Sequence, residues 1–152
     1  PATSSAASDV YKRQLIPLLI SNCLNWKKLP IYGDGKNIRD WLFVEDHCEA
    51  ICEVLDKGKV GETYNIGGNN QTSNIEITQK ICSILDKLSP NKKGEHSQLI
   101  EFVQDRPGHD FRYNLDTSKI KKELNWQPSE TFDSGLEKTV SWYFEKYISG
   151  EK

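Results

Sequence analysis

The stretch Asp105-Arg106-Pro107-Gly108-His109-Asp110 decides how the fold of this chain is interpreted, because its arginine and histidine lie only three residues apart. Proline fixes one φ angle and glycine permits an unusual one, so the backbone can turn sharply and aim both side chains at one point. Arginine binds phosphate oxygens through a planar fork, and histidine can donate a further hydrogen bond. The stretch therefore suits a diphosphate. The alternative is a surface turn in which Arg106 pairs with a neighbouring aspartate, since turns rich in Asp, Pro and Gly are common.

The composition is that of one globular domain. The chain has 152 residues, enough for a hydrophobic core, with 28% charged residues and a net charge of -2. A nucleic-acid surface would need a basic face, and no apolar run is long enough to cross a membrane. We therefore expect a cytoplasmic protein with no signal peptide and with no nucleic-acid or membrane partner. Its cysteines are expected to be reduced, buried apolar groups: Cys23, Cys48, Cys52 and Cys82.

Residues 1–13 are expected to be a non-native or disordered tail. They are mostly small and polar without periodicity, and the apolar pattern starts abruptly near Leu15. A native flexible N-terminus is the alternative. Residues 14–152 are then the folded domain.

Apolar residues at helical spacing predict a series of helices, at about residues 15–26, 45–57, 75–89, 119–124 and 131–147. In the second helix Cys48, Ile51, Cys52 and Leu55 share one face, which we interpret as facing the core. His47 lies beside Cys48, but a metal site would need further converging ligands, so none is expected.

Short extended runs alternate with these helices, which predicts an α/β fold with short strands. The glycines of Gly33-Asp34-Gly35 predict a hairpin turn between the first two runs. Asn65 stands at the carboxyl end of the third run, where open α/β sheets place their ligands; a turn asparagine bonded to its own backbone is the alternative. The sequence contains no glycine-rich dinucleotide fingerprint. The expected strands span about residues 29–32, 38–44, 62–66, 99–103 and 111–115.

Several stretches taken together resemble the C-terminal, substrate-binding part of the extended short-chain dehydrogenase/reductases, which are NAD(P)-binding Rossmann-type enzymes. The resemblance extends in order from Leu15 to about Tyr147, and the Arg-Pro-Gly-His-Asp turn narrows it to the dTDP-glucose 4,6-dehydratases. The turn also distinguishes the chain from the sister epimerases and decarboxylases. The matching stretches are Leu15-Ile16-Pro17-Leu18, Leu29-Pro30-Ile31-Tyr32-Gly33-Asp34-Gly35, Ile38-Arg39-Asp40-Trp41-Leu42-Phe43-Val44-Glu45-Asp46-His47, Gly61-Glu62-Thr63-Tyr64-Asn65-Ile66-Gly67-Gly68, the Asp105–Asp110 turn and Glu130-Thr131-Phe132-Asp133-Ser134-Gly135.

The resemblance implies which residues would bind the nucleoside part of dTDP-glucose. Pro30, Ile31 and Tyr32 would line the nucleoside pocket. Leu15 would lie near the nucleotide, and Tyr143 would reach it from the last helix.

The resemblance implies a second group of residues for the diphosphate. Arg39 and Arg106 would bind it with two cationic forks, and Asn65 and His109 would complete its hydrogen bonds. The turn that carries Arg106 and His109 also contains Asp105, Pro107 and Gly108, which the resemblance likewise implies as substrate-binding residues.

The resemblance also implies that this chain lacks half of the enzyme. Family members carry an N-terminal Rossmann half that binds NAD and supplies the catalytic tyrosine, lysine and acidic pair. The whole enzyme would oxidise C4 of the sugar, eliminate water across C5 and C6, return the hydride to C6, and usually be a homodimer. We therefore predict no catalytic and no metal-binding residue in this chain. The missing Rossmann half would be its partner, and the chain alone would be inactive.

Two other functions stay open at this point. The chain could be a non-catalytic nucleotide-sugar-binding module that acts with a separate partner chain. It could also belong to a UDP-sugar decarboxylase or epimerase of the same family, and the thymine methyl discriminates these bases by only about 1 kcal/mol. If the chain is the substrate-binding half of an enzyme of this family, the apolar face that the Rossmann half would cover should be exposed. Such a face should promote self-association of the chain.

Overall fold

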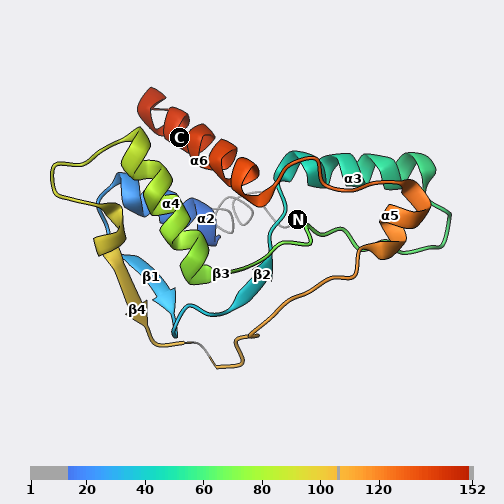
Figure 1. The fold of residues 1–152 in the computed structure, drawn as a ribbon, viewed down its shortest axis with the longest axis horizontal. Coiled ribbons are helices and arrows are strands. Elements are labelled where there is room, and N and C mark those ends of the chain that lie inside the picture. The colour runs from blue at the N-terminus through green and yellow to red at the C-terminus, as the bar shows by residue number, and fades with distance from the viewer. Residues whose placement is uncertain (1–13, 106, 151–152) are drawn as a thin grey trace, which may run out of the picture. The chain divides into compact units, whose positions relative to one another are not determined.

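The protein has an α/β fold of short strands and helices (Figure 1). The computed structural model describes residues 14–105 and 107–150, so the predicted tail and Arg106 lie outside the described residues. No helix among them is long and apolar enough to span a membrane. The elements follow one another as α2 (Leu15–Leu24), β1 (Leu29–Tyr32), β2 (Ile38–Asp40), α3 (Val44–Lys57), β3 (Gln71–Ser73), α4 (Asn74–Leu88), the 3-10 helix η1 (His96–Leu99), β4 (Ile100–Val103), α5 (Ser118–Leu124) and α6 (Phe132–Ser149).

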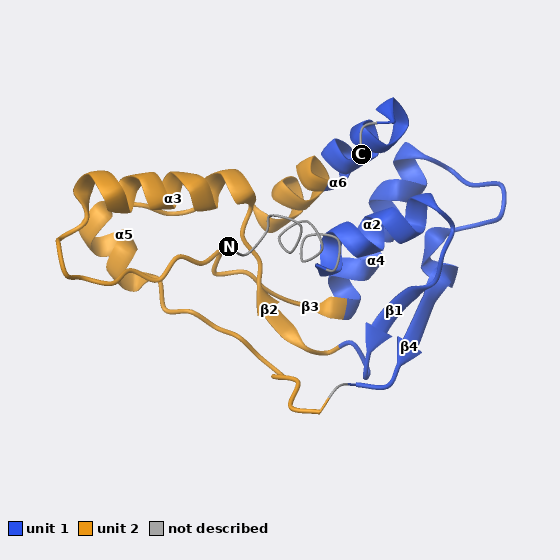
Figure 2. Cartoon of the chain, turned by 180° about the vertical axis from the view of Figure 1, so that it is seen from behind, with its two compact units in different colours: residues 1–35, 75–106, 140–152 blue, residues 36–74, 107–139 orange. Residues whose placement is uncertain are grey.

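The chain divides into two compact units (Figure 2). Unit 1 comprises residues 1–35, 75–106 and 140–152, and unit 2 comprises residues 36–74 and 107–139. Within the described residues each unit contains one two-stranded sheet. In unit 1, β1 pairs with β4 in parallel, and in unit 2, β2 pairs with β3 in antiparallel orientation.

Unit 1 has its core between its sheet and its helices. α2 contacts β1, and Pro17 lies in the first turn of α2, where its missing N–H leaves no hydrogen bond unmade. α2 ends two residues before the predicted Trp26, whose φ of +54° is left-handed and incompatible with a continuing helix. Apolar side chains with at most 1% exposure come from α2, β1 and α4, and include Leu19, Ile20, Leu29, Ile31, Ile77, Ile81 and Leu85.

The turn after β1 does not form the predicted hairpin. Gly33 and Gly35 have φ values of +59° and +73°, as a glycine turn requires. However, the Gly33 N–H donates to the Val103 carbonyl at 2.9 Å and extends the pairing of β1 with β4. The Gly35 carbonyl accepts a hydrogen bond from Ile75 at 3.0 Å, and a Cβ on Gly35 would lie only 2.8 Å from Ile31. β2 therefore pairs with β3 instead of returning along β1.

Unit 2 has a core centred on Trp126. Ala50 of α3 packs there with Ile120 and Leu124 of α5. The predicted strand at residues 62–66 is wrong, since these residues form no strand in the described part of the chain. The run instead packs alternate side chains on the core without a neighbouring strand to complete its backbone pairing. The half-buried residues of this cluster are Leu42, Val54, Tyr64 and Ile66.

α3 carries the predicted apolar stripe, but that stripe does not face the core. Of the predicted members Ile51 is 43% exposed and Leu55 81%, and Val44, which is not among them, is 64% exposed. The side of the helix that packs on the unit 2 core presents Ala50 and Val54 instead. The interpretation of this stripe as a core face is therefore wrong, and we name these three exposed residues the outer stripe of α3.

The cysteines divide between the core and the surface, and all four are free thiols. Cys23 and Cys82 are buried as predicted, and a hydrogen bond with Cys82, together with burial, raises the pKa of the Cys23 thiol. Cys48 and Cys52 are exposed, which contradicts the prediction that they are buried. The residues that the structure describes contain no group of three or more His, Cys, Asp or Glu side chains that could hold a metal ion.

A buried carboxylate fastens the chain before α6 to α3. Asp46 is 1% exposed, and its Oδ1 accepts hydrogen bonds from the Ser129 backbone N–H at 3.0 Å and the Ser129 hydroxyl at 2.6 Å. Its Oδ2 accepts the Glu130 N–H at 3.2 Å. Burial acts to raise the pKa of Asp46, but the hydrogen bonds from Ser129 and Glu130 outweigh it and lower that pKa.

We expect Asp46→Asn to lower the free energy of unfolding by about 2 kcal/mol, because an amide replaces the charge-assisted acceptor. Since the folded pKa is depressed, the contribution of Asp46 is present above the unfolded pKa and is lost as pH falls through the folded value. Urea unfolding at about pH 7 and about pH 2 should therefore show a difference between variant and wild type that shrinks in acid.

Asp56→Asn is the matched control for this measurement, because Asp56 is an exposed residue of the same helix. We expect it to change the unfolding free energy by less than about 0.5 kcal/mol. Equal losses for the two variants would contradict the role given to Asp46.

Candidate functional site

The residues that the sequence predicts to bind a nucleotide sugar are divided between the two units. Unit 1 contains Leu15, Pro30, Ile31, Tyr32, Asp105 and Tyr143. Unit 2 contains Arg39, Asn65, Pro107, Gly108 and His109. Arg106, the arginine of the predicted diphosphate turn, lies outside the described residues.

Arg39 of β2 is the centre of a cluster of polar groups in unit 2. Its Nη2 donates to His109 Nε2 at 3.0 Å and to the Asp110 carbonyl at 2.9 Å, and its Nη1 donates to the Ile38 carbonyl at 2.7 Å. The guanidinium carbon lies 4.6 Å from the centre of the Tyr113 ring, in a cation–π contact. The structure thus brings together two of the residues predicted for the diphosphate, Arg39 and His109.

Backbone hydrogen bonds align the segment after the turn with β2. The Ile38 N–H donates to the Phe111 carbonyl at 2.8 Å, and the Tyr113 N–H donates to the Ile38 carbonyl at 3.1 Å. The segment therefore lies parallel to β2 through a bridge at Arg112, although it does not form the predicted strand at residues 111–115. Gly108 has a φ of +70°, so the glycine supplies the left-handed conformation that its sequence predicts.

The contact with Arg39 fixes the proton arrangement of His109. A guanidinium carries only donors, so the Nε2 of His109 has to accept the hydrogen bond. A neutral imidazole that accepts at Nε2 has its N–H at Nδ1. The guanidinium itself has five N–H groups, and its hydrogen bonds to described residues employ three of them. The Arg39 guanidinium is therefore equipped to donate to the oxygens of an anion.

Asn65 is positioned by a different part of unit 2. Its Nδ2 donates to the Asp116 carbonyl at 3.1 Å, so its amide contacts the backbone that leads into α5. The residue is exposed. This contact joins two loops distant in sequence, unlike the bond to its own backbone that a turn asparagine would make.

The unit 1 residues have very different exposures. Ile31 is 1% exposed and belongs to the core, whereas Tyr32 beside it is 48% exposed. Asp105 lies against the turn after β1, because a Cβ on Gly33 would be 3.2 Å from its carboxylate. Tyr143 is half-buried and packs edge-on against Trp142, with ring centres 4.8 Å apart.

Sequence reasoning missed two residues that build the Arg39 cluster. Asn37, 5% exposed, donates through Nδ2 to the Asp110 carbonyl at 3.3 Å. The Tyr113 hydroxyl donates to the Asp110 carboxylate. No local pattern identifies either residue. Asn37 bonds a partner 73 residues later, and Tyr113 contacts Arg39 only because the fold places its segment beside β2.

A solved structure and a family model each match most of this chain. A solved dTDP-glucose 4,6-dehydratase from Bacillus anthracis, in complex with NAD, matches 90% of this chain and 41% of that chain, with 49% sequence identity and a TM-score of 0.77. The family model described as GDP-mannose 4,6 dehydratase matches residues 3–139, and the chain belongs to this family.

Curated relatives narrow the relationship within the family. The dTDP-glucose 4,6-dehydratase of Neisseria meningitidis is 55% identical over 138 residues, which are 89% of this chain and 39% of the relative. The enzyme of the same name from Haemophilus influenzae is 56% identical over 136 residues, 88% of this chain and 40% of the relative. The chain thus spans about two fifths of the length of the curated relatives it matches.

We expect Arg39→Gln to loosen the segment after the turn, because the variant loses the hydrogen bonds to Asp110 and His109 and the contact with Tyr113. Amide hydrogen exchange followed by NMR should be about tenfold faster at Tyr113, which corresponds to about 1.4 kcal/mol of lost local stability. The Trp41 amide, which donates to Asn70 at 3.0 Å, is the internal control and should keep its rate. Unchanged exchange at Tyr113 would show that Arg39 does not hold the segment.

Proposed function

We propose that this chain binds the nucleotide sugar of a dTDP-glucose 4,6-dehydratase, the hydro-lyase that converts dTDP-glucose to its 4-dehydro-6-deoxy product. The observation that carries the proposal is the Arg39–His109 contact, at 3.0 Å, in a chain more than half identical to enzymes of that name. It joins two predicted diphosphate residues that lie 70 positions apart.

The proposed diphosphate group consists of Arg39, Arg106 and His109, with Asn65. Arg39 and Arg106 are the cationic forks, and a fork donating to two oxygens of one phosphate is both directional and charge-assisted. His109, which contacts Arg39, is proposed to complete the hydrogen bonds to the diphosphate. The turn residues Asp105, Pro107 and Gly108 shape the backbone that carries Arg106.

The proposed nucleoside group consists of residues of unit 1. Pro30 and the exposed Tyr32 offer an apolar edge and an aromatic ring, which suit a base and a ribose. The Ile31 side chain belongs to the core, so it supports its neighbours and contacts a ligand only through its backbone. Leu15 and Tyr143 are proposed to contribute the remaining apolar contacts.

NAD and the catalytic groups are proposed to belong to the part of the relatives that lies outside this chain. The residues that are described do not fit a dinucleotide: β3 runs directly into α4 without a glycine-rich turn to admit a pyrophosphate. Tyr32 and Lys36 have a Tyr-x-x-x-Lys spacing, but Tyr32 ends β1 and a glycine turn follows, so no helix aligns them. We therefore propose that the chain alone binds substrate without converting it.

The outer stripe of α3 supports a proposal about partners. Val44, Ile51 and Leu55 place an apolar surface on the side of the helix that is not packed on the unit 2 core. Exposed surfaces of this kind are typical of interfaces. We propose that the Rossmann half covers the outer stripe in the intact dehydratase, which is proposed to be a homodimer.

Ligand binding tests the proposed function directly. In titrations of the chain with dTDP, UDP and GDP followed by backbone amide shifts, we expect saturable changes with dTDP. Arg106→Ala and Arg39→Lys should each weaken binding by about tenfold or more, because each removes a two-bond contact to phosphate. UDP should bind at most about tenfold more weakly than dTDP, because its base lacks only the methyl group of thymine.

Lys122→Gln is the control for these titrations, because Lys122 is an exposed cation of α5. It should bind dTDP like the wild type. Absent shifts in a folded sample, or equal losses in Lys122→Gln and Arg106→Ala, would contradict the assignment of the diphosphate group. Tighter binding of UDP would favour a decarboxylase or epimerase.

Self-association tests the proposed role of the outer stripe. We expect the sedimentation coefficient of the chain to rise with protein concentration, and Leu55→Glu to reduce this rise because it places a charge in the apolar contact. Val60→Glu is the matched control, since Val60 is equally apolar and fully exposed but lies beyond the end of α3. A monomer at every concentration, or equal effects of the two variants, would contradict the proposal.

A further inference from the structure

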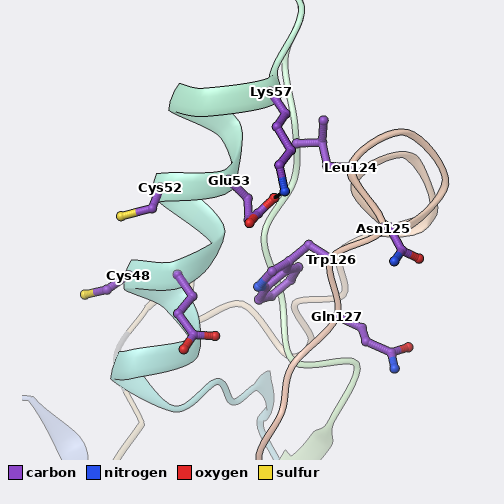
Figure 3. Close-up of a pocket in the computed structure, with 9 residues that line it drawn as sticks. Cys48, Cys52, Glu53, Lys57, Leu124, Asn125, Trp126 and Gln127 are labelled. Atoms are coloured by element: carbon purple, nitrogen blue, oxygen red, sulfur yellow. Dashed lines mark hydrogen bonds and ion pairs between the residues drawn. The ribbon is translucent and has the colours of Figure 1, made fainter.

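Unit 2 contains a cavity that the proposed nucleotide-sugar residues do not line. Its volume is about 570 Å³, and it lies between α3 and the residues at the end of α5 (Figure 3). Pockets for small organic ligands have volumes of this order. The polar side chains that line it are Glu49, Glu53, Lys57, Asn125 and Gln127, beside the indole of Trp126.

A buried donor faces this cavity without a partner. Trp126 is 6% exposed, and its Nε1 has no hydrogen-bond partner among the described residues. Figure 3 shows the nitrogen edge of the indole turned toward α3. A buried N–H without an acceptor costs free energy, and most buried polar groups in proteins are satisfied. The cavity therefore offers one strong, oriented donor to a ligand that brings an acceptor.

The other lining groups determine the class of that ligand. Glu49 and Glu53 present carboxylates, which accept hydrogen bonds and repel anions. Lys57 donates to Glu53 at 2.6 Å, so the charges of this pair largely cancel, and the unpartnered N–H of Trp126 requires an acceptor from the ligand. The amides of Asn125 and Gln127 both donate and accept.

A ligand that satisfies all of these groups must both donate and accept hydrogen bonds and carry no net charge. Hydroxyl groups do both, and several of them on one ring can meet a donor and a carboxylate at once. We propose that this cavity is a binding site for a neutral, hexose-sized sugar, in which Trp126 donates to one hydroxyl and Glu49 accepts from another.

The proposal is independent of the proposed function, because the two groups of residues have no member in common. A sugar without a phosphate would enter this cavity, whereas a nucleoside diphosphate would be repelled by Glu49 and Glu53. The two sites can therefore be tested with different probes on the same chain.

The test follows the indole N–H signals of the four tryptophans during titration of the full chain with methyl α-D-glucopyranoside. Trp126→Phe identifies the signal of Trp126 by its loss. We expect that signal to shift saturably, with half-saturation at or below about 50 mM. The signal of Trp142, which is 48% exposed on α6, should not follow it.

Glu49→Ala tests the acceptor without disturbing the core, because Glu49 is exposed on α3. We expect it to weaken sugar binding by about fivefold or more. Glu137→Ala, an exposed glutamate of α6, is the matched control and should bind like the wild type. Because dTDP is proposed to bind elsewhere, it should not displace the sugar.

Several results would overturn the proposal. One is a Trp126 signal that does not move, or that moves linearly together with the signals of the other tryptophans. Another is glycerol producing the same shift at the same concentration, which would mean that any hydroxyl compound suffices. Equal binding by wild type and Glu49→Ala would also contradict the site.

Discussion

A cation held inside unit 2 is the constraint on which the candidate site depends. Arg39 is always charged and has no acceptor of its own, so its half-buried guanidinium requires partners that accept. It obtains them from two backbone carbonyls and from the ring of His109. The same contacts draw the turn that carries His109 to the edge of β2. Satisfying the arginine therefore also brings Arg39 and His109 together, the two described side chains that we propose for the diphosphate.

A buried anion has the corresponding role elsewhere in unit 2. Asp46 is a buried carboxylate that accepts hydrogen bonds from Ser129 and from the backbone N–H of Glu130. Like Arg39, it binds a segment that is distant in sequence, and both do so with charge-assisted hydrogen bonds. The strands of unit 2 are only three residues long, so these two polar anchors contribute order that a larger sheet would supply by itself.

Local sequence predicts the helices well and their surroundings poorly. α4 spans Asn74–Leu88, within a residue of its predicted limits, because its apolar period is unbroken and Pro90 follows. Gly108 adopts the positive φ that its turn predicts. The contact between Arg39 and His109 spans 70 residues, and only a resemblance to known enzymes could indicate it. Asn37 and Tyr113 escaped prediction because their roles arise from that long-range contact.

Two of the failed predictions have a common physical form. The outer stripe of α3 is a helix face without a cover, and residues 62–66 are an extended run without a neighbouring strand among the described residues. The outer stripe has the apolar pattern of a buried face but is exposed, whereas the run at residues 62–66 packs its side chains on the core and lacks only a paired strand in the described part of the chain. Both elements also pack on the same core, around Trp126. The apolar residues of an element indicate the surfaces on which it is buried in the folded protein. This chain spans about two fifths of the length of the curated relatives it matches. Both failures therefore lie in unit 2, where the outer stripe is the surface that we propose the Rossmann half covers.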